Sequence, residues 1–110
     1  MAPKTVSRFE VWWANLDPTI GHEIRKTRPV LIISPDELNR HLGTVLVAPL
    51  TSTIRPYPFR VKTVVCDIPG QVALDQIRAL DKARLTRRMA VLPEEARREI
   101  VSVLQLMFAE

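Results

Sequence analysis

The sequence contains a single cysteine, Cys66, and this scarcity limits what the chain can build. One cysteine cannot form an internal disulfide or a cysteine-based metal cage. Such cysteine use is typical of a reducing compartment, so we expect a cytoplasmic location. His22 and His41, the only histidines, are not spaced with acidic residues as a metal-ligand motif requires. The sequence therefore predicts neither a metal site nor a cofactor.

Long apolar runs are also missing. The stretches 30–33 and 45–50 are far too short to cross a bilayer, so no membrane partner is expected. No internal repeat or low-complexity tract is present, and the prolines are scattered along the chain. Because 110 residues have room for one hydrophobic core, we expect a single domain over residues 1–110.

The sequence does have an excess of positive charge. Sixteen Lys and Arg face 12 Asp and Glu, which leaves a formal net charge of +4 at pH 7. Such a balance favours an anionic partner, and clustering of the charge strengthens the case for nucleic acid. The two basic clusters are Arg25, Lys26 and Arg28 in one segment, and Arg55, Arg60 and Lys62 in another.

Hydrophobic periodicity predicts mainly β-structure. The apolar run 30–33 is typical of a strand buried on both faces. In the stretch 59–65, alternation predicts that Phe59 and Val61 face the core while Arg60 and Lys62 face solvent. The other predicted strands are residues 9–16, residues 44–48, and residues 71–80 as a strand pair or one bent strand opened by Gly70.

Two helices are predicted. Ser34-Pro35-Asp36-Glu37 has the residues of a capping box, and Gly43 suits the position after a short helix. From Pro93 onward, apolar residues recur at helical spacing: Ala96, Ile100, Val103, Leu104, Met107 and Phe108. The fold class is thus α+β, mainly β: a small antiparallel barrel with a short internal helix and a C-terminal amphipathic helix.

Adjacent tryptophans place a further constraint on the first strand. Trp12 and Trp13 must point to opposite faces, so only one of them can fill the core. The other needs cover from a dimer interface or from the terminal helix.

A long ordered set of residues resembles the MazF/PemK (Kid) family of toxins. It begins with Leu16-Asp17-Pro18-Thr19-Ile20-Gly21-His22-Glu23 and continues with Arg28-Pro29, Ser34-Pro35, Asn39, Ala48-Pro49-Leu50-Thr51-Ser52, Asp75-Gln76-Ile77-Arg78 and Ala83-Arg84. The resemblance covers nearly the whole chain. One position departs from the pattern, because this chain has Ala73 where the Kid branch carries an arginine two residues before the aspartate.

The resemblance implies an SH3-like barrel, a homodimer and a type II toxin–antitoxin endoribonuclease. It implies sequence-selective cleavage of single-stranded RNA, mRNA in particular, which leaves 2′,3′-cyclic phosphate and 5′-hydroxyl ends and inhibits translation and growth. The implied antitoxin is expected to cover the basic loops with an acidic, partly disordered segment. The toxin–antitoxin complex is expected to bind operator DNA through the antitoxin.

On the family pattern, Arg28 and Thr51 are the central catalytic pair, with Glu23, His22 and Asp75 as further catalytic candidates. A guanidinium stays charged and grips two phosphate oxygens in one plane, and Thr51 adds a hydroxyl donor. His22, Glu23 and Asp75 remain alternatives for the general base. Asp75 is either tied by backbone hydrogen bonds or exposed toward the substrate.

The remaining candidates are basic, polar or aromatic side chains suited to the RNA backbone or to stacking on a base. They are Arg25, Lys26, Ser52, Arg55, Tyr57, Arg60, Lys62, Arg78 and Arg84. Phe59 could also stack, but its place in the alternation favours the core.

Two other functions are compatible with a small basic barrel. A non-enzymatic gyrase poison resembling CcdB would need no phosphate-gripping arginine at the Arg28-Pro29 position. An RNA-binding barrel without catalysis would bind in a salt-dependent way and leave RNA intact.

Overall fold

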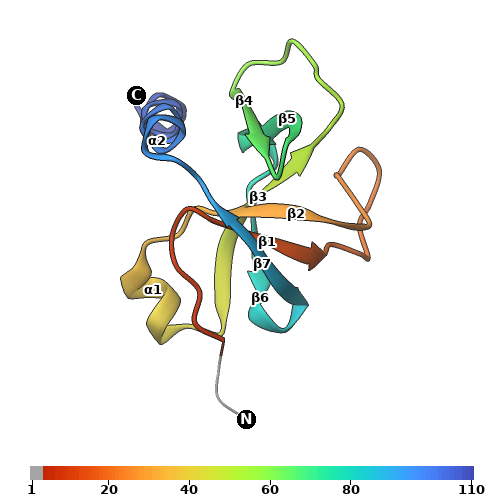
Figure 1. Cartoon of the computed structure of the whole chain (residues 1–110), viewed down its shortest axis with the longest axis vertical. Helices are drawn as coiled ribbons and strands as arrows, with labels where there is room; N and C mark the ends of the chain where they lie inside the picture. The colour runs from red at the N-terminus through yellow and green to blue at the C-terminus, as the bar shows by residue number, and fades with distance from the viewer. Residues whose placement is uncertain (1–3) are drawn as a thin grey trace.

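The computed structural model describes residues 4–110, and its elements are mostly short antiparallel strands (Figure 1). The strands are β1 (Glu10–Asn15), β2 (Thr27–Ile32), β3 (Thr44–Thr51), β4 (Arg60–Val65), β5 (Ile68–Ala73), β6 (Arg78–Asp81) and β7 (Leu85–Val91). The helices are α1 (Asp36–His41) and α2 (Glu94–Phe108), with the short 3-10 turns η1 (Leu74–Gln76) and η2 (Lys82–Arg84).

The strands form one strongly bent sheet in the order β4-β5-β3-β2-β1-β7, with β6 added beside β3. The long strand β3 joins the two halves, because its first part pairs with β6 and its last two residues, Leu50 and Thr51, pair with β5. Figure 1 shows the β4–β5 hairpin above the layer formed by β1, β2 and β7. The predicted α+β, mainly β barrel is confirmed.

Strand β2 divides the core into two hydrophobic clusters. Leu31 packs in the cluster that α2 covers, whereas Val30 and Ile32 pack in the cluster on the other side with Trp12 and Leu80. All three β2 residues have no exposed surface. The prediction of a strand buried on both faces is therefore confirmed.

Helix α2 begins after Pro93 and lies on the first cluster through the predicted stripe. Ile100 is fully buried, whereas Phe108, at the helix end, is 75% exposed. Two glutamates in the first turn, Glu94 and Glu95, interact favourably with the helix dipole. No helix within residues 4–110 is long and apolar enough to cross a membrane.

Strand β7 was not predicted from the sequence. Its segment alternates poorly, because Arg87 and Arg88 are both exposed and only Leu85 is buried. Pairing with β1, from Glu10 opposite Val91 onward, supplies its backbone hydrogen bonds instead. The strand thus depends on a long-range partner rather than on its own pattern.

The capping box predicted for α1 is wrong. Pro35 precedes the first helical residue and no side chain caps the helix. Ser34 instead donates from Oγ to Asn39 Oδ1 at 2.5 Å and accepts from the Leu46 amide, which ties α1 to β3. Gly43 does not adopt the left-handed conformation expected after a helix end.

Gly70 lies inside β5 rather than opening it, since the strand begins at Ile68. A Cβ at this position would lie 2.6 Å from the carbonyl oxygen of Thr51. Gly70 therefore permits the backbones of β5 and β3 to approach closely beside a predicted catalytic residue.

Only one of the two tryptophans belongs to the core, as predicted. Trp12 is 8% exposed, whereas Trp13 is half-buried on the opposite face. Trp13 lines an apolar groove of about 130 Å³, and within residues 4–110 no part of α2 lines that groove. Helix α2 therefore does not cover Trp13. The groove is also lined by Pro29, Leu50, Thr51, Ser52, Thr63, Val65, Ile68, Pro69, Gly70 and Met89.

Candidate functional site

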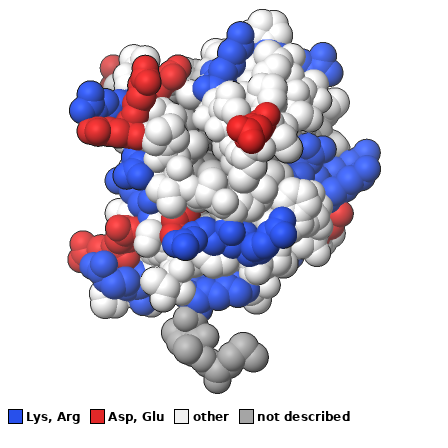
Figure 2. Space-filling model, in the orientation of Figure 1, with Lys and Arg blue, Asp and Glu red and all other residues white. Residues whose placement is uncertain are grey.

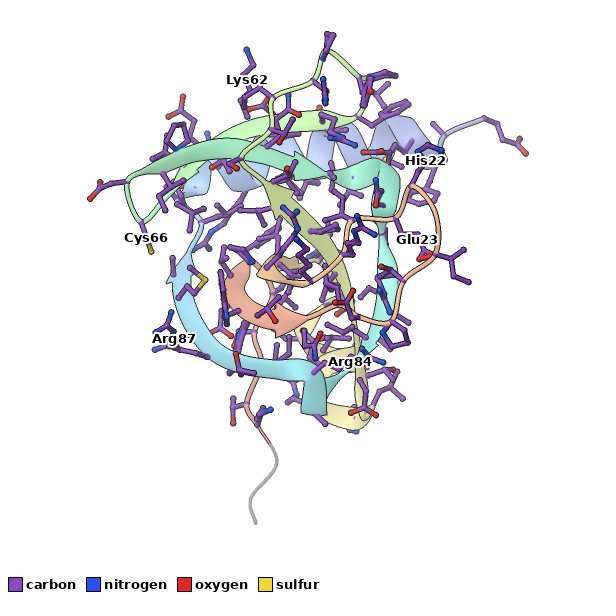
Figure 3. The ribbon with its side chains drawn as sticks, turned by 90° about the vertical axis from the view of Figure 1, so that its right-hand side faces the viewer. His22, Glu23, Lys62, Cys66, Arg84 and Arg87 are labelled. Carbon is purple, nitrogen blue, oxygen red and sulfur yellow. The ribbon has the colours of Figure 1, made fainter. Side chains whose placement is uncertain are left out.

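Two adjoining cavities open where the loop between β1 and β2 meets the ends of β3 and β5. The larger, about 600 Å³, includes Glu23 and Arg78 in its lining, and the smaller, about 350 Å³, includes Thr51. His22 and Asp75 line both cavities. Figure 3 shows His22 and Glu23 on the same loop, beside the strands that end at the site.

The base of the β1–β2 loop is closed by hydrogen bonds. The amide of Leu16 donates to the carbonyl of Lys26, and the Lys26 amide donates to Asp17 Oδ1, both at 3.0 Å. Arg78 Nη1 donates to the Leu16 carbonyl at 3.0 Å, and Arg84 Nη1 donates to the Asp17 carbonyl. These two arginines, predicted to bind RNA, therefore also hold the loop in place.

Gln76 fixes the part of this loop that contains His22. Its Oε1 accepts a hydrogen bond from the Ile24 amide at 2.6 Å, and its Nε2 donates to the His22 carbonyl at 3.4 Å. Sequence reasoning did not select Gln76, because a neutral amide has no titratable group. Its only signal was its place in the Asp75-Gln76-Ile77-Arg78 motif.

A second loop, residues 52–59, is held by the buried amide of Gln71. Gln71 is 2% exposed; it donates to the Arg55 carbonyl at 2.8 Å and accepts from the Arg55 amide at 3.1 Å. Nearby, the Thr51 hydroxyl oxygen accepts from the Thr53 amide at 3.2 Å. The loop thereby places Arg55 and Tyr57 at the smaller cavity. Gln71 was also missed from the sequence, since a single glutamine in a strand has no distinguishing pattern.

The predicted orientations of Phe59 and Arg60 are both wrong. Phe59 is 40% exposed and adopts a left-handed conformation with φ 61°, so the alternation of β4 begins only after it. The Arg60 side chain is only 7% exposed and forms an ion pair with Asp75. Lys62, on the same strand, is exposed as predicted and points away from the body of the molecule (Figure 3).

Asp75 lies in η1, directly after β5, and its side chain is 36% exposed. Its two oxygens accept hydrogen bonds from Arg60 Nε at 2.7 Å and from Arg60 Nη2 at 3.1 Å. The sequence left open whether Asp75 is tied by backbone hydrogen bonds or exposed toward the substrate. The structure supports the second alternative, because the carboxylate faces a cavity. Its partner is a side chain rather than the backbone.

Arg28 and Thr51 lie at the ends of neighbouring strands. The antiparallel pairing of β2 and β3 runs from Ile32 opposite Val47 to Val30 opposite Pro49, and Arg28 and Thr51 each lie two residues beyond this paired stretch. Arg28 is half-buried, and its Nε donates to the Arg25 carbonyl at 2.7 Å. The Arg28 side chain therefore lies along the β1–β2 loop and outside the lining of both cavities.

The structure brings most, but not all, of the predicted site residues together. Those that line one or both cavities are His22, Glu23, Thr51, Arg55, Tyr57, Arg60, Asp75 and Arg78. Those that line neither cavity are Arg25, Lys26, Arg28, Ser52, Lys62 and Arg84. Within residues 4–110, no three His, Cys, Asp or Glu side chains come together as metal ligands.

Basic side chains are unevenly spread over the surface. Figure 2 shows Lys and Arg at the right edge and in a band across the lower half of the face, and further ones at the top and along the left edge, where most of the acidic side chains lie. Arg25, Lys26 and Arg55 are exposed and belong to loops that border the cavities. The entrance to the site is thus suited to a polyanion.

The sequence and the fold both match known proteins. The family model of the PemK-like, MazF-like toxins of type II toxin–antitoxin systems matches residues 7–108 of the chain. The chain belongs to this family. It is 39% identical over 105 residues to the endoribonuclease PemK of Escherichia coli, an alignment that covers 90% of this chain and 79% of PemK. It is 34% identical over 110 residues to the endoribonuclease EndoA of Bacillus subtilis (strain 168), covering 94% and 95% of the two chains.

Solved structures of this family have the same fold. The crystal structure of MazF from Deinococcus radiodurans superposes with a TM-score of 0.83 at 29% identity and covers 94% of this chain and 96% of that one. An endoribonuclease from a mycobacterial species, solved in complex with its cognate antitoxin, has a TM-score of 0.79 at 26% identity, with coverages of 96% and 98%. The protein is thus an endoribonuclease toxin, as predicted, and the gyrase poison and the non-catalytic barrel are disfavoured.

Proposed function

We propose that this toxin cleaves single-stranded RNA, mRNA in particular, at selected sequences and without a metal ion. In this reaction the 2′-hydroxyl of the RNA attacks the adjacent phosphorus, so a 2′-O–P bond forms and the P–O5′ bond breaks. The products are a 2′,3′-cyclic phosphate and a 5′-hydroxyl, and the loss of intact mRNA inhibits translation and growth. The observation that carries the proposal is the convergence of His22, Thr51, Arg60 and Asp75 on a solvent-open cavity with a basic entrance.

The reaction needs a base, positive charge at the phosphate and a proton for the leaving oxygen. Arg28 supplies the charge, for which its side chain must leave the Arg25 carbonyl and turn toward Thr51 when RNA binds. The Thr51 hydroxyl supplies a short hydrogen bond to a phosphate oxygen. The 2′-hydroxyl proton passes to one of His22, Glu23 and Asp75, which lie around the two cavities. The exposed arginines and lysines of both loops bind the RNA backbone, and Tyr57, which is also exposed, stacks on a base.

Cleavage by the purified toxin is expected to persist in excess EDTA, because arginine side chains neutralise the phosphate charge in this mechanism. Mapping the ends on a long RNA should show 5′-hydroxyls at a repeated short sequence. Activity that is lost in EDTA and restored by a divalent ion would contradict the proposal. RNA that is bound but left intact would instead support the non-catalytic barrel.

We further propose that residues 1–110 act as one toxin domain and that two copies form a homodimer. Support comes from the half-buried Trp13, whose apolar groove is left uncovered by the terminal helix. Light scattering at micromolar concentration is expected to show about twice the chain mass of 12.5 kDa. A mass equal to that of one chain would refute the dimer.

The cognate antitoxin is proposed to inhibit the toxin by covering the basic loops with an acidic, partly disordered segment, and to carry the complex to operator DNA. Such a segment gains affinity by folding on a wide basic surface. The exposed Arg25, Lys26 and Arg55 on the two loops support this mode. Inhibition that left RNA binding unchanged would exclude it.

A further inference from the structure

The smaller cavity contains an arginine–aspartate pair that the sequence pattern did not indicate. Arg60 comes from β4 and Asp75 from η1, and two hydrogen bonds of 2.7 and 3.1 Å join the guanidinium edge to the carboxylate. Two parallel hydrogen bonds fix the plane of a guanidinium as well as its position. The Arg60 side chain is 7% exposed, so the pair holds an oriented positive charge in the cavity wall rather than on the open surface.

The residue opposite Arg60 makes room for this arrangement. In the register of β4 and β5, Arg60 pairs with Ala73, and cross-strand partners project from the same face of a sheet. Ala73 is fully buried, and its methyl group is the smallest side chain that the position could carry apart from glycine. A large side chain at position 73 would therefore compete with Arg60 for the space beside Asp75.

Tyr57 completes the surroundings of the guanidinium. The carbon Cζ of Arg60 lies 5.0 Å from the centre of the Tyr57 ring, which is a cation–π distance. Nε and Nη2 of Arg60 donate hydrogen bonds to Asp75, whereas Nη1 of Arg60 donates none to any of residues 4–110. The guanidinium thus keeps a free edge for an anion while its orientation is already fixed.

We propose that Arg60 binds an RNA phosphate in the smaller cavity and that Asp75 is a positioning residue which orients Arg60, not the general base. This proposal rests on the proposed RNA cleavage and assigns the residues within it. Both oxygens of Asp75 already accept hydrogen bonds from Arg60, so the proton of the attacking 2′-hydroxyl goes to His22 or Glu23. The Kid branch carries an arginine at the position of Ala73 on β5. In this chain Arg60, the cross-strand partner of Ala73 on β4, supplies the positive charge instead.

The test measures kcat and KM on a single-stranded RNA oligonucleotide with a mapped cleavage site, with circular dichroism to verify folding. Arg60→Ala is expected to lower kcat/KM by at least about tenfold, as for loss of a preorganised anion-stabilising donor. Arg60→Lys is expected to lose at least about fivefold, because an ammonium keeps the charge but not the planar two-point contact. Asp75→Asn should lose less than Arg60→Ala, since the amide oxygen still accepts one hydrogen bond.

Two further variants sharpen the result. In the double variant Arg60→Ala/Ala73→Arg, an arginine reaches Asp75 from the opposite strand, and activity is expected to recover to within about fivefold of the unchanged chain. Arg98→Ala is the matched control, because Arg98 also pairs with a carboxylate, Glu94 at 2.8 Å, but on the exposed surface of α2. Its kcat/KM should be unchanged.

A folded Arg60→Ala protein that cleaves within about twofold of the unchanged chain would overturn the proposal, as would Arg60→Lys with full activity. Abolished cleavage in Asp75→Asn alongside an active Arg60→Ala would return Asp75 to the role of base. Binding of an oligonucleotide with a 2′-deoxy sugar at the cleaved position separates this inference from the cleavage itself. If the unchanged chain cuts no RNA, the proposed function fails, whereas weaker binding of that oligonucleotide by Arg60→Ala would still support the phosphate site.

Discussion

Arg28→Ala is expected to reduce RNA cleavage by more than about a hundredfold, a loss of roughly 3 kcal/mol of transition-state stabilisation. The reason is that Arg28, near the strand end that adjoins the β3 end with Thr51, is assigned to neutralise the charge on the phosphate oxygens, which develops most strongly in the transition state. Its Nε contact with the Arg25 carbonyl holds the side chain along the loop in the free protein. The rate constant of cleavage of an RNA oligonucleotide under single-turnover conditions measures the effect directly.

Thr51→Ala is measured in the same experiment and is expected to lower the cleavage rate less than Arg28→Ala does. A hydroxyl contributes one neutral hydrogen bond, worth about 1 to 2 kcal/mol, so roughly tenfold is expected to be lost. Arg40→Ala is the charge-matched control, because Arg40 is exposed on α1 and lines neither cavity of the site. If Arg28→Ala retained near wild-type rates in a folded protein, the mechanism centred on Arg28 would have to be abandoned.

Gly70→Ala is expected to damage both stability and cleavage. The added Cβ would lie 2.6 Å from the Thr51 carbonyl oxygen and 3.3 Å from its carbonyl carbon, and both atoms belong to the backbone. Relief of this overlap must push β5 away from the end of β3, at a cost of about 1 to 3 kcal/mol of folding free energy. The same shift displaces Thr51, so cleavage per folded molecule should fall by roughly tenfold.

Thermal unfolding followed by circular dichroism measures the first effect, for which a fall in Tm of about 4 to 8 °C per kcal/mol is expected. Gly43→Ala is the matched control. A Cβ at Gly43 would meet nothing within 4 Å, and this glycine does not adopt a left-handed conformation. Its stability should change by less than about 1 kcal/mol. Equal Tm values for the two variants would show that the approach of β5 to β3 is not tight.

The features that the sequence predicted correctly are those encoded by neighbouring residues. The apolar run within β2 and the helical stripe of α2 both depend on local periodicity, and both pack in the core as expected, except for Phe108 at the end of the stripe, which is exposed. The ordered motif from Leu16 to Glu23 and onward identified the family, which the match over residues 7–108 confirmed. The capping box failed because Pro35 takes the N-cap position, and the Ser34 side chain bonds to Asn39 and to the Leu46 amide of β3 instead of to the first turn of the helix.

The tertiary structure alone decided how the site is assembled. Gln76 holds the loop of His22 across more than 50 positions in the sequence, and Arg60 meets Asp75 only because β4 and β5 form a hairpin. Strand β7 likewise exists through its pairing with β1. An arginine has a long apolar stem and a charged end, so alternation cannot tell whether it faces solvent or a buried carboxylate. That choice depends on where the partner lies, and the fold alone brings the two together.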